Sequence, residues 1–318
     1  MQALIYRRFG PPEVLEWVEG WPRPTPAKGQ LLVRVAAGSV NPKDVLLRKG
    51  HFHRTLAREP LPRVTGLDAA GKVVEVGDGV DDLVHGDRVF GMSNRFCGGV
   101  LAEYALFDRG ELGRAPESLS PVESAAVPLA ALTALQALRD LGRLEPGQSL
   151  LINGASGGVG HFAVQIGRIM GAEVHAVCGP SNAGFVTQLG AAQVHDYSEA
   201  SPDAIDHGFD VVFDVFGNQD PRLLARQLGR DGVFVSTVPR GRTIGRELLA
   251  RLGLGRRRLV LVRSRGDDLE RLAAWIDRGE LRPHIDRVYA PGDGAEAHRH
   301  VERKHTVGKV VVALPGGG

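Results

Sequence analysis

Short apolar runs broken by Gly, Pro and Asp dominate the first 120 residues. Short apolar runs bounded by such turn residues are typical of strands. The predicted strands are QLLVRVAAGSV (30–40), KVVEVG (72–77), DRVFG (87–91) and LAEYALF (101–107). This part of the chain is therefore expected to be rich in β-structure.

From residue 121 to residue 265, apolar strands alternate with segments of helical periodicity, a pattern that predicts a parallel sheet. The expected strands are LLING (150–154), EVHAVC (173–178), AQVHDY (192–197), FDVVFDVFG (209–217), GVFVSTV (232–238) and RRLVLVR (257–263). After residue 266 the pattern predicts helix 267–279, strand 284–290, helix 294–304 and strand 308–314. We expect the two ends of the chain to form one domain, with the alternating block inserted between them.

A glycine-rich turn follows the first strand of the alternating block. LLINGASGGVG (150–160) leads from strand to turn, and HFAVQIGRIMGA (161–172) has helical periodicity. This order is typical of a dinucleotide-binding fold, because the turn and the helix N-terminus present N–H groups to a pyrophosphate. Ala155 replaces the middle glycine of the usual G-x-G-x-x-G pattern. The turn residues predicted to bind the cofactor are Gly154, Ser156, Gly157, Gly158, Val159 and Gly160.

The end of the next strand indicates which nicotinamide cofactor binds. An acidic residue at this position would accept hydrogen bonds from the free ribose of NAD and would repel a 2′-phosphate. The segment 178–182 (CGPSN) has no carboxylate, and its small polar groups, with Cys178 and Ser181 among them, can surround a phosphate. No Arg or Lys stands in the segment either. The sequence favours NADPH.

Composition excludes several classes of protein. The formal net charge of this 318-residue chain is only +2, which gives no general signal for a polyanionic partner. Arg256, Arg257 and Arg258 form a basic cluster without interleaved aromatic residues, which favours a solvated edge or a subunit contact over nucleic acid. Two cysteines give no disulfide framework, and no apolar run has the length of a membrane span. We expect a cytoplasmic protein that binds neither membrane nor nucleic acid.

Linked motifs along nearly the whole chain resemble the zinc-independent quinone oxidoreductase branch of the medium-chain dehydrogenases/reductases. They are AAGSVNPKDVLLRKG (36–50), GLDAAGKVVEVGDGV (66–80), GDRVFG (86–91), LAEYA (101–105), PLAALTALQAL (128–138), INGASGGVG (152–160), LGAAQVHDY (189–197), FDVVFDVFG (209–217), RGELRPHIDRVYA (278–290) and GKVVVAL (308–314).

The resemblance implies an α/β fold class with two domains. A β-rich, GroES-like catalytic domain would comprise residues 1–120 and 266–318, and an inserted Rossmann domain, residues 121–265, would bind NADPH on a parallel sheet. It also implies a homodimer, and hydride transfer to a small-molecule quinone or α,β-unsaturated carbonyl in a cleft between the domains. Two alternatives remain open, namely a biosynthetic enoyl or tailoring reductase and a non-catalytic NADPH-binding redox sensor. Several relatives have tyrosines in the first cleft loop, where this chain has Leu46, Leu47 and Phe52.

Zinc-dependent relatives hold a catalytic metal at two positions that correspond to Asn41 and Leu67. Leucine offers zinc no ligand, and the structural zinc loop of those relatives needs more cysteines than this chain has. Asp68 alone is interpreted as a structural carboxylate. We therefore expect no metal site.

Asn41 and Lys43 are the candidate catalytic residues. Asn41 would hydrogen-bond a substrate oxygen or the nicotinamide side, or would merely fix the turn before Pro42. Lys43 would donate to the oxyanion of the reduced substrate, with a solvated surface lysine as the simpler alternative. Asp44 is expected to stabilise the loop as an acceptor.

Three further residues are candidate cofactor contacts on the strength of the resemblance. Thr133 matches a threonine that faces the nicotinamide ribose, unless it bonds its own helix backbone. Tyr197 matches a tyrosine beside the adenosine phosphate, or is an ordinary tyrosine at the end of a sheet. Lys309 directly follows Gly308. Relatives often have a basic residue just before this glycine, where this chain has Val307. Lys309 is either a cofactor contact or solvated.

Overall fold

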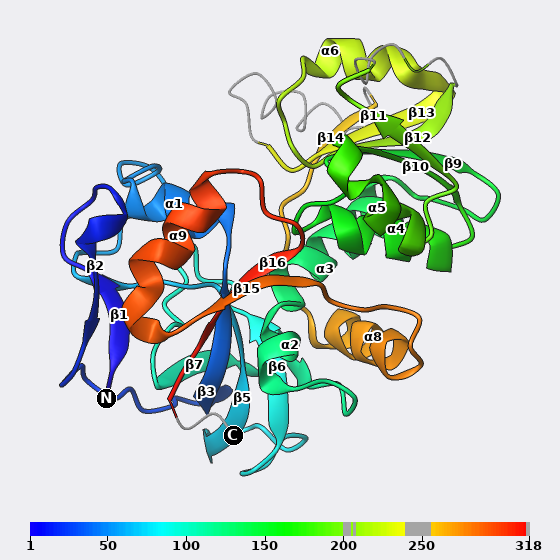
Figure 1. Ribbon diagram of the computed structural model, residues 1–318. Coiled ribbons are helices and arrows are strands. Elements are labelled where there is room, and N and C mark those ends of the chain that lie inside the picture. The colour runs from blue at the N-terminus through cyan, green and yellow to red at the C-terminus, as the bar shows by residue number, and fades with distance from the viewer. Residues whose placement is uncertain (200–204, 206–207, 239–255, 316–318) are drawn as a thin grey trace. The chain divides into compact units, whose positions relative to one another are not determined.

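The computed structural model describes residues 1–199, 205, 208–238 and 256–315 (Figure 1). The chain divides into two compact units. The first comprises Met1–Leu129 and Arg263–Gly318, and the second comprises Ala130–Val262.

The first unit is built on a seven-stranded sheet and a three-stranded sheet. The large sheet has the order β15-β16-β3-β5-β6-β8, and β7 also pairs with β3. Its strands are β3 (Gln30–Val40), β5 (Asp68–Val76), β6 (Arg88–Met92), β7 (Tyr104–Asp108), β8 (Leu112–Arg114), β15 (Ile285–Tyr289) and β16 (Lys309–Ala313). The small sheet has the order β2-β1-β4, with β1 (Ala3–Tyr6), β2 (Leu15–Val18) and β4 (Arg63–Val64). Apolar residues of β3, β5, β6 and β16, among them Leu31, Val73 and Val312, form the core of this unit.

The helices of the first unit are α1 (Pro42–Arg48), α2 (Pro121–Ala125), α8 (Gly266–Asp277) and α9 (Gly294–Glu302). Helix α3 (Pro128–Gln136) starts in the first unit and continues into the second.

The second unit contains a six-stranded parallel sheet with the order β11-β10-β9-β12-β13-β14. Its strands are β9 (Ser149–Asn153), β10 (Glu173–Cys178), β11 (Gln193–Asp196), β12 (Phe209–Asp214), β13 (Leu228–Ser236) and β14 (Arg257–Leu259). Its helices are α4 (Gly160–Ile169), α5 (Ala183–Gln188) and α6 (Pro221–Leu224). Helix α4 packs against β9 and β10, which fixes the turn between β9 and α4. The α/β fold class and the parallel sheet predicted from the sequence are confirmed.

Several element boundaries differ from the prediction. The segment after Asn41, expected to be a loop, forms helix α1, because Pro42 stands at its first turn and the Asp44 carboxylate accepts the backbone N–H of Asn41 at 2.8 Å. Strand β14 ends at Leu259, shorter than the predicted strand to Arg263. Strands β1 and β2 were not predicted; they are four residues each, too short for a periodicity signal.

Candidate functional site

The glycine turn of the second unit has the form of a phosphate-binding turn. Strand β9 ends at Asn153, and helix α4 begins at Gly160. Gly154 has φ of 88°, a left-handed conformation that favours glycine, and its N–H donates to Val177 O of the adjacent strand. Ser156, Gly157, Gly158 and Val159 are all half-buried, so this stretch of the turn keeps some exposure. In the first turn of α4, the N–H groups of His161 and Ala163 donate to Gly157 O and Val159 O, each at 3.0 Å, which ties the helix to the turn before it.

Two glycines of the turn differ in the space around them. A Cβ on Gly160 would lie 2.1 Å from the carbonyl oxygen of Gly154, so helix and turn touch backbone to backbone. This close contact is with the turn that follows β9 and not with the strand itself. A Cβ on Gly157 would have only Gly154 O within 4 Å, at 3.6 Å. The protein therefore leaves the Gly157 side of the turn open, which suits a phosphate.

The residues after β10 lie next to this turn. Asn182 donates from Nδ2 to Ser156 Oγ at 3.3 Å, which ties the segment after β10 to the glycine turn. Ser181 is exposed. Tyr197 is 56% exposed, and its hydroxyl lies 3.0 Å from where a Gly179 Cβ would stand. The structure thus brings Ser156, Ser181 and Tyr197 into one neighbourhood at the carboxyl ends of β9, β10 and β11.

The Cys178 side chain belongs to the core rather than to this surface. It is 2% exposed, and burial raises the pKa of its thiol. The cofactor contact predicted for Cys178 stays a prediction, with a thiol that lies in the core.

One carboxylate near this site was missed by sequence reasoning, which considered only the end of β10. Asp196 pairs with Cys178 in the β10–β11 register. Its Oδ1 accepts hydrogen bonds from the backbone N–H of Ser198 at 2.8 Å and from the Ser198 hydroxyl at 2.7 Å. A signal was present, because parallel strands end at a common edge and Asp196 closes the next strand.

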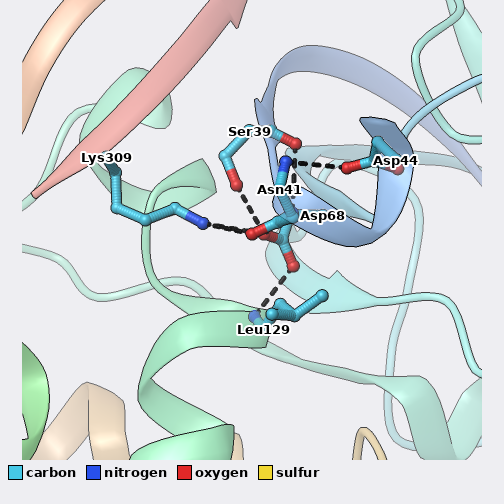
Figure 2. A network of polar contacts seen from close by, with 6 residues as sticks. All are labelled: Ser39, Asn41, Asp44, Asp68, Leu129 and Lys309. Atoms are coloured by element: carbon cyan, nitrogen blue, oxygen red, sulfur yellow. Dashed lines mark hydrogen bonds and ion pairs between the residues drawn. The ribbon is translucent and has the colours of Figure 1, made fainter. Parts of the chain in front are cut away.

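Asn41 and Lys309 meet in a buried polar network in the first unit (Figure 2). Lys309 Nζ donates to Asn41 Oδ1 at 2.5 Å and lies 3.5 Å from Asp68 Oδ2. Asn41 Nδ2 donates to Asp68 Oδ2 at 3.0 Å. The side chains of Asn41, Asp68 and Lys309 are 2%, 0% and 3% exposed. The two residues are brought together by the antiparallel pairing of β16 with β3, although 268 positions separate them.

Asp68 is the centre of this network. Its carboxylate also accepts from the Ser39 hydroxyl and from the backbone N–H of Leu129, at 2.8 Å, in the first turn of α3. Burial lowers the pKa of Lys309, and the carboxylates of Asp68 and Asp44 oppose that shift. The interpretation of Asp68 as a structural carboxylate agrees with these contacts. The alternative of a solvated Lys309 is wrong.

Asp44 is a second buried carboxyl group beside the network. Its Oδ2 accepts the Asn41 backbone N–H, whereas its Oδ1 is buried without a hydrogen-bond partner among the described residues. Burial raises the pKa of Asp44 to about 7, and the hydrogen bond from Asn41 opposes the shift. The expected role as an acceptor is present, but the carboxyl group stabilises a helix start and not a loop.

Lys43 lies in a different environment from Asn41. Its side chain is half-buried, and Nζ stands 4.5 Å from the centroid of the Phe96 ring. Burial lowers the pKa of Lys43, and the Asp44 carboxylate opposes that shift. Phe96 packs edge to face against Phe52, with centroids 5.7 Å apart. Lys43 is thus more than a solvated surface lysine, and Phe96 is a neighbour that the sequence did not indicate.

Thr133 lies within α3 and is 5% exposed. Leu67 is fully buried. Within residues 1–199, 205, 208–238 and 256–315, no three His, Cys, Asp or Glu side chains are grouped so as to hold a metal ion. In the same part of the chain, no helix has the length and apolar character needed to cross a membrane.

Two family models match the chain. A model described as an alcohol dehydrogenase GroES-like domain matches residues 27–117, and one described as a zinc-binding dehydrogenase matches residues 189–312. The first match falls within the unit that carries the Asn41 network, and the second includes Tyr197 and Lys309.

Individual relatives extend over the whole chain. A chloroplast envelope quinone oxidoreductase homolog from Arabidopsis thaliana is 31% identical over 98% of this chain and 98% of its own length. An NADPH-dependent alkenal/one oxidoreductase from the same organism is 31% identical over 98% of this chain and 79% of its own length. The solved structure of the quinone oxidoreductase from Coxiella burnetii is 32% identical, with a TM-score of 0.89 over 98% of this chain and 99% of that one.

These similarities extend over both units of the chain. One of these relatives, the alkenal/one oxidoreductase, is NADPH-dependent by name. The protein belongs to the quinone oxidoreductase branch of the medium-chain dehydrogenase/reductase superfamily.

Proposed function

We propose that the protein is an NADPH-dependent reductase that transfers a hydride to a quinone or an α,β-unsaturated carbonyl compound without zinc. Its membership of an oxidoreductase family and its fit to a nicotinamide cofactor support the general reaction. NADPH, the acceptor class and the independence from zinc are the parts that we add.

The observation that carries the proposal is the state of Asp68. Its oxygens already accept from Ser39, Asn41, Leu129 and the Lys309 ammonium, so the carboxylate at the centre of the network is held by protein donors. Asn41 and Leu67 occupy the positions of two zinc ligands in zinc-dependent relatives, and neither supplies a thiolate, an imidazole or a carboxylate. An acceptor that is already electrophilic, such as a quinone or an enone, does not need a Lewis acid.

The glycine turn fits a dinucleotide because the protein leaves the Gly157 side of it open. The backbone N–H groups of Ser156, Gly158, Val159 and Gly160 would hold the pyrophosphate. Gly154 and Gly157, whose N–H groups donate to Val177 O and Gly154 O, would shape the turn that presents them. Ser181 and Tyr197 would contact the adenosine ribose and its 2′-phosphate, and Thr133 the nicotinamide ribose. A bound NADPH would supply the hydride.

The chain's own residues would orient the reactants and stabilise charge. After hydride arrives at carbon, the substrate oxygen carries negative charge and takes up a proton. We assign Lys43 to this oxygen, because its half-buried ammonium has no hydrogen-bonded or ion-paired partner among the described residues and is already partly desolvated beside Phe96. Asn41 is assigned to the nicotinamide side of the site.

A panel of acceptors tests the proposal. Benzoquinones, naphthoquinones, short enones and enoyl thioesters are each mixed with NADPH, and the loss of NADPH absorbance is followed. We expect turnover with quinones or enones, and Lys43→Ala should lower kcat by about 10²-fold, within the range for one oxyanion donor. The control Lys72→Ala changes an exposed lysine on β5 and should leave kcat unchanged.

The other outcomes of this panel would favour one of the two alternative functions. Turnover with enoyl thioesters alone would indicate a biosynthetic enoyl reductase. Binding of NADPH without turnover on any acceptor would favour the redox sensor. The homodimer and the cytoplasmic location remain predictions, which light scattering and cell fractionation can test.

A further inference from the structure

The orientation of the Asn41 amide is fixed by the chemistry of its neighbours. A lysine ammonium can only donate a hydrogen bond, so the amide oxygen must face Lys309 Nζ, at 2.5 Å. An ionised carboxylate can only accept, so the amide nitrogen must face Asp68 Oδ2, at 3.0 Å. Rotating the amide by 180° would place a donor against the ammonium and an acceptor against the carboxylate. The two charged neighbours therefore select one orientation.

This orientation determines which hydrogen-bonding groups of the Asn41 amide are available to a ligand. Besides Asp68, the amide nitrogen has the carbonyl oxygen of Ser39 as an acceptor, at 3.4 Å. Both N–H groups thus have partners inside the protein. The oxygen has a second lone pair beyond the one that Lys309 uses. Asn41 can present an acceptor and no donor, which suits a hydroxyl or amide N–H of the nicotinamide riboside and not a bare quinone oxygen.

Lys309 is bound into this network and is not directed at a phosphate. Its side chain is 3% exposed, its ammonium contacts Asn41 and Asp68, and its backbone N–H donates to His284 O at 2.9 Å. It stands at the start of β16, whose next residue, Val310, pairs with Val40 directly before Asn41. The pairing of β16 with β3 thus places the Lys309 ammonium next to the Asn41 amide.

We infer that Lys309 is a positioning residue that acts through Asn41: its ammonium holds the amide so that the oxygen is offered to the nicotinamide side of the site. The inference rests on the proposed function, in which Asn41 contacts that side. It replaces the expectation that Lys309 contacts the cofactor itself.

The test is a double-mutant cycle of Lys309→Met and Asn41→Ala, with exposed Lys72→Met as the matched control. We measure the dissociation constant of NADPH by nucleotide fluorescence and the single-turnover rate with NADPH and with its C4-deuterated form. Each single variant should slow hydride transfer by about 10- to 100-fold, the range for a misplaced reactant. The deuterium isotope effect on steady-state kcat should rise, because hydride transfer becomes the slower step of turnover. The double variant should be no slower than the slower single variant, since Lys309 acts only through Asn41.

Three results would overturn the inference. Additive losses in the double variant would mean that Lys309 and Asn41 act separately. A loss of discrimination between NADPH and NADH in Lys309→Met, with the hydride-transfer rate unchanged, would return Lys309 to a phosphate contact. A merely structural role would lower the melting temperature without raising the isotope effect.

Two provisions keep the test decisive. Lys309→Met leaves a buried carboxylate without its cation, so if it does not fold, Lys309→Met/Asp68→Asn removes both charges and takes its place in the cycle. If the wild-type protein reduces no acceptor, the proposed function fails. The double-mutant cycle then compares the NADPH dissociation constants of the variants in place of their rates. Non-additive constants would still support coupling between Lys309 and Asn41, whereas additive or unchanged constants would refute it.

Discussion

Gly160→Ala should damage the nucleotide-binding turn although it adds only one methyl group. The new Cβ would stand 2.1 Å from Gly154 O and 2.8 Å from the backbone carbons of Ala155, and the oxygen would have to move by more than 1 Å to restore ordinary contact. Overpacking of this kind costs about 1–3 kcal/mol, and alanine returns up to about 1 kcal/mol through its helix propensity. We expect a net loss of about 1–2 kcal/mol in the free energy of unfolding. The affinity for NADPH should also fall, because the turn itself is displaced.

The assay compares three glycine-to-alanine variants by thermal unfolding and nucleotide fluorescence. Gly184→Ala is the control, because its Cβ on α5 would meet no atom within 4 Å. Gly157→Ala should keep the melting temperature, since its Cβ would meet only Gly154 O, at 3.6 Å, yet it should weaken NADPH binding by filling the open side of the turn. Gly160→Ala should lower the melting temperature by about 2–8 °C and weaken binding as well. Wild-type stability and affinity in Gly160→Ala would refute the close-approach argument.

Three further predictions concern the cofactor, the metal and pH. The protein should bind NADPH more tightly than NADH, because no carboxylate stands in residues 178–182; equal or tighter NADH binding by fluorescence would count against the assignment. Turnover should survive extensive chelation, since the Asp68 oxygens already accept from protein donors; recovery of activity on adding zinc to a chelated, inactive sample would contradict this. Asp44 should make the folded state less stable as pH rises from about 4 to about 7, because its pKa is about 7 when folded and near 3.9 when unfolded, so the folded state holds the proton more tightly. Asp44→Asn should therefore gain stability over the wild type at pH 8 relative to pH 5, and parallel urea midpoints for the two proteins across this range would show that Asp44 does not titrate there.

The order of elements and the cofactor turn were within reach of the sequence because both are local. Strand, glycine turn and helix follow one another between Leu150 and Ile169, and hydrophobic periodicity marks each element without knowledge of its neighbours. The same reasoning failed where an element was short or where a side chain set the outcome. Helix α1 has seven residues and begins through the Asp44 carboxylate, so its apolar pattern is too brief to distinguish it from a loop.

The sequence by itself determined the strand–turn–helix order, the family and the absence of zinc-ligand side chains at positions 41 and 67, because each is a property of residue type and spacing. Tertiary structure decided which residues act together. Lys309 reaches Asn41 through the pairing of β16 with β3, and Asp196 lies beside Cys178 through the pairing of β11 with β10. Burial, which also depends on the whole fold, withdrew Cys178 into the core and shifted the pKa of Asp44. Pairing between distant strands and desolvation arise only when the chain is folded, and no local pattern encodes them.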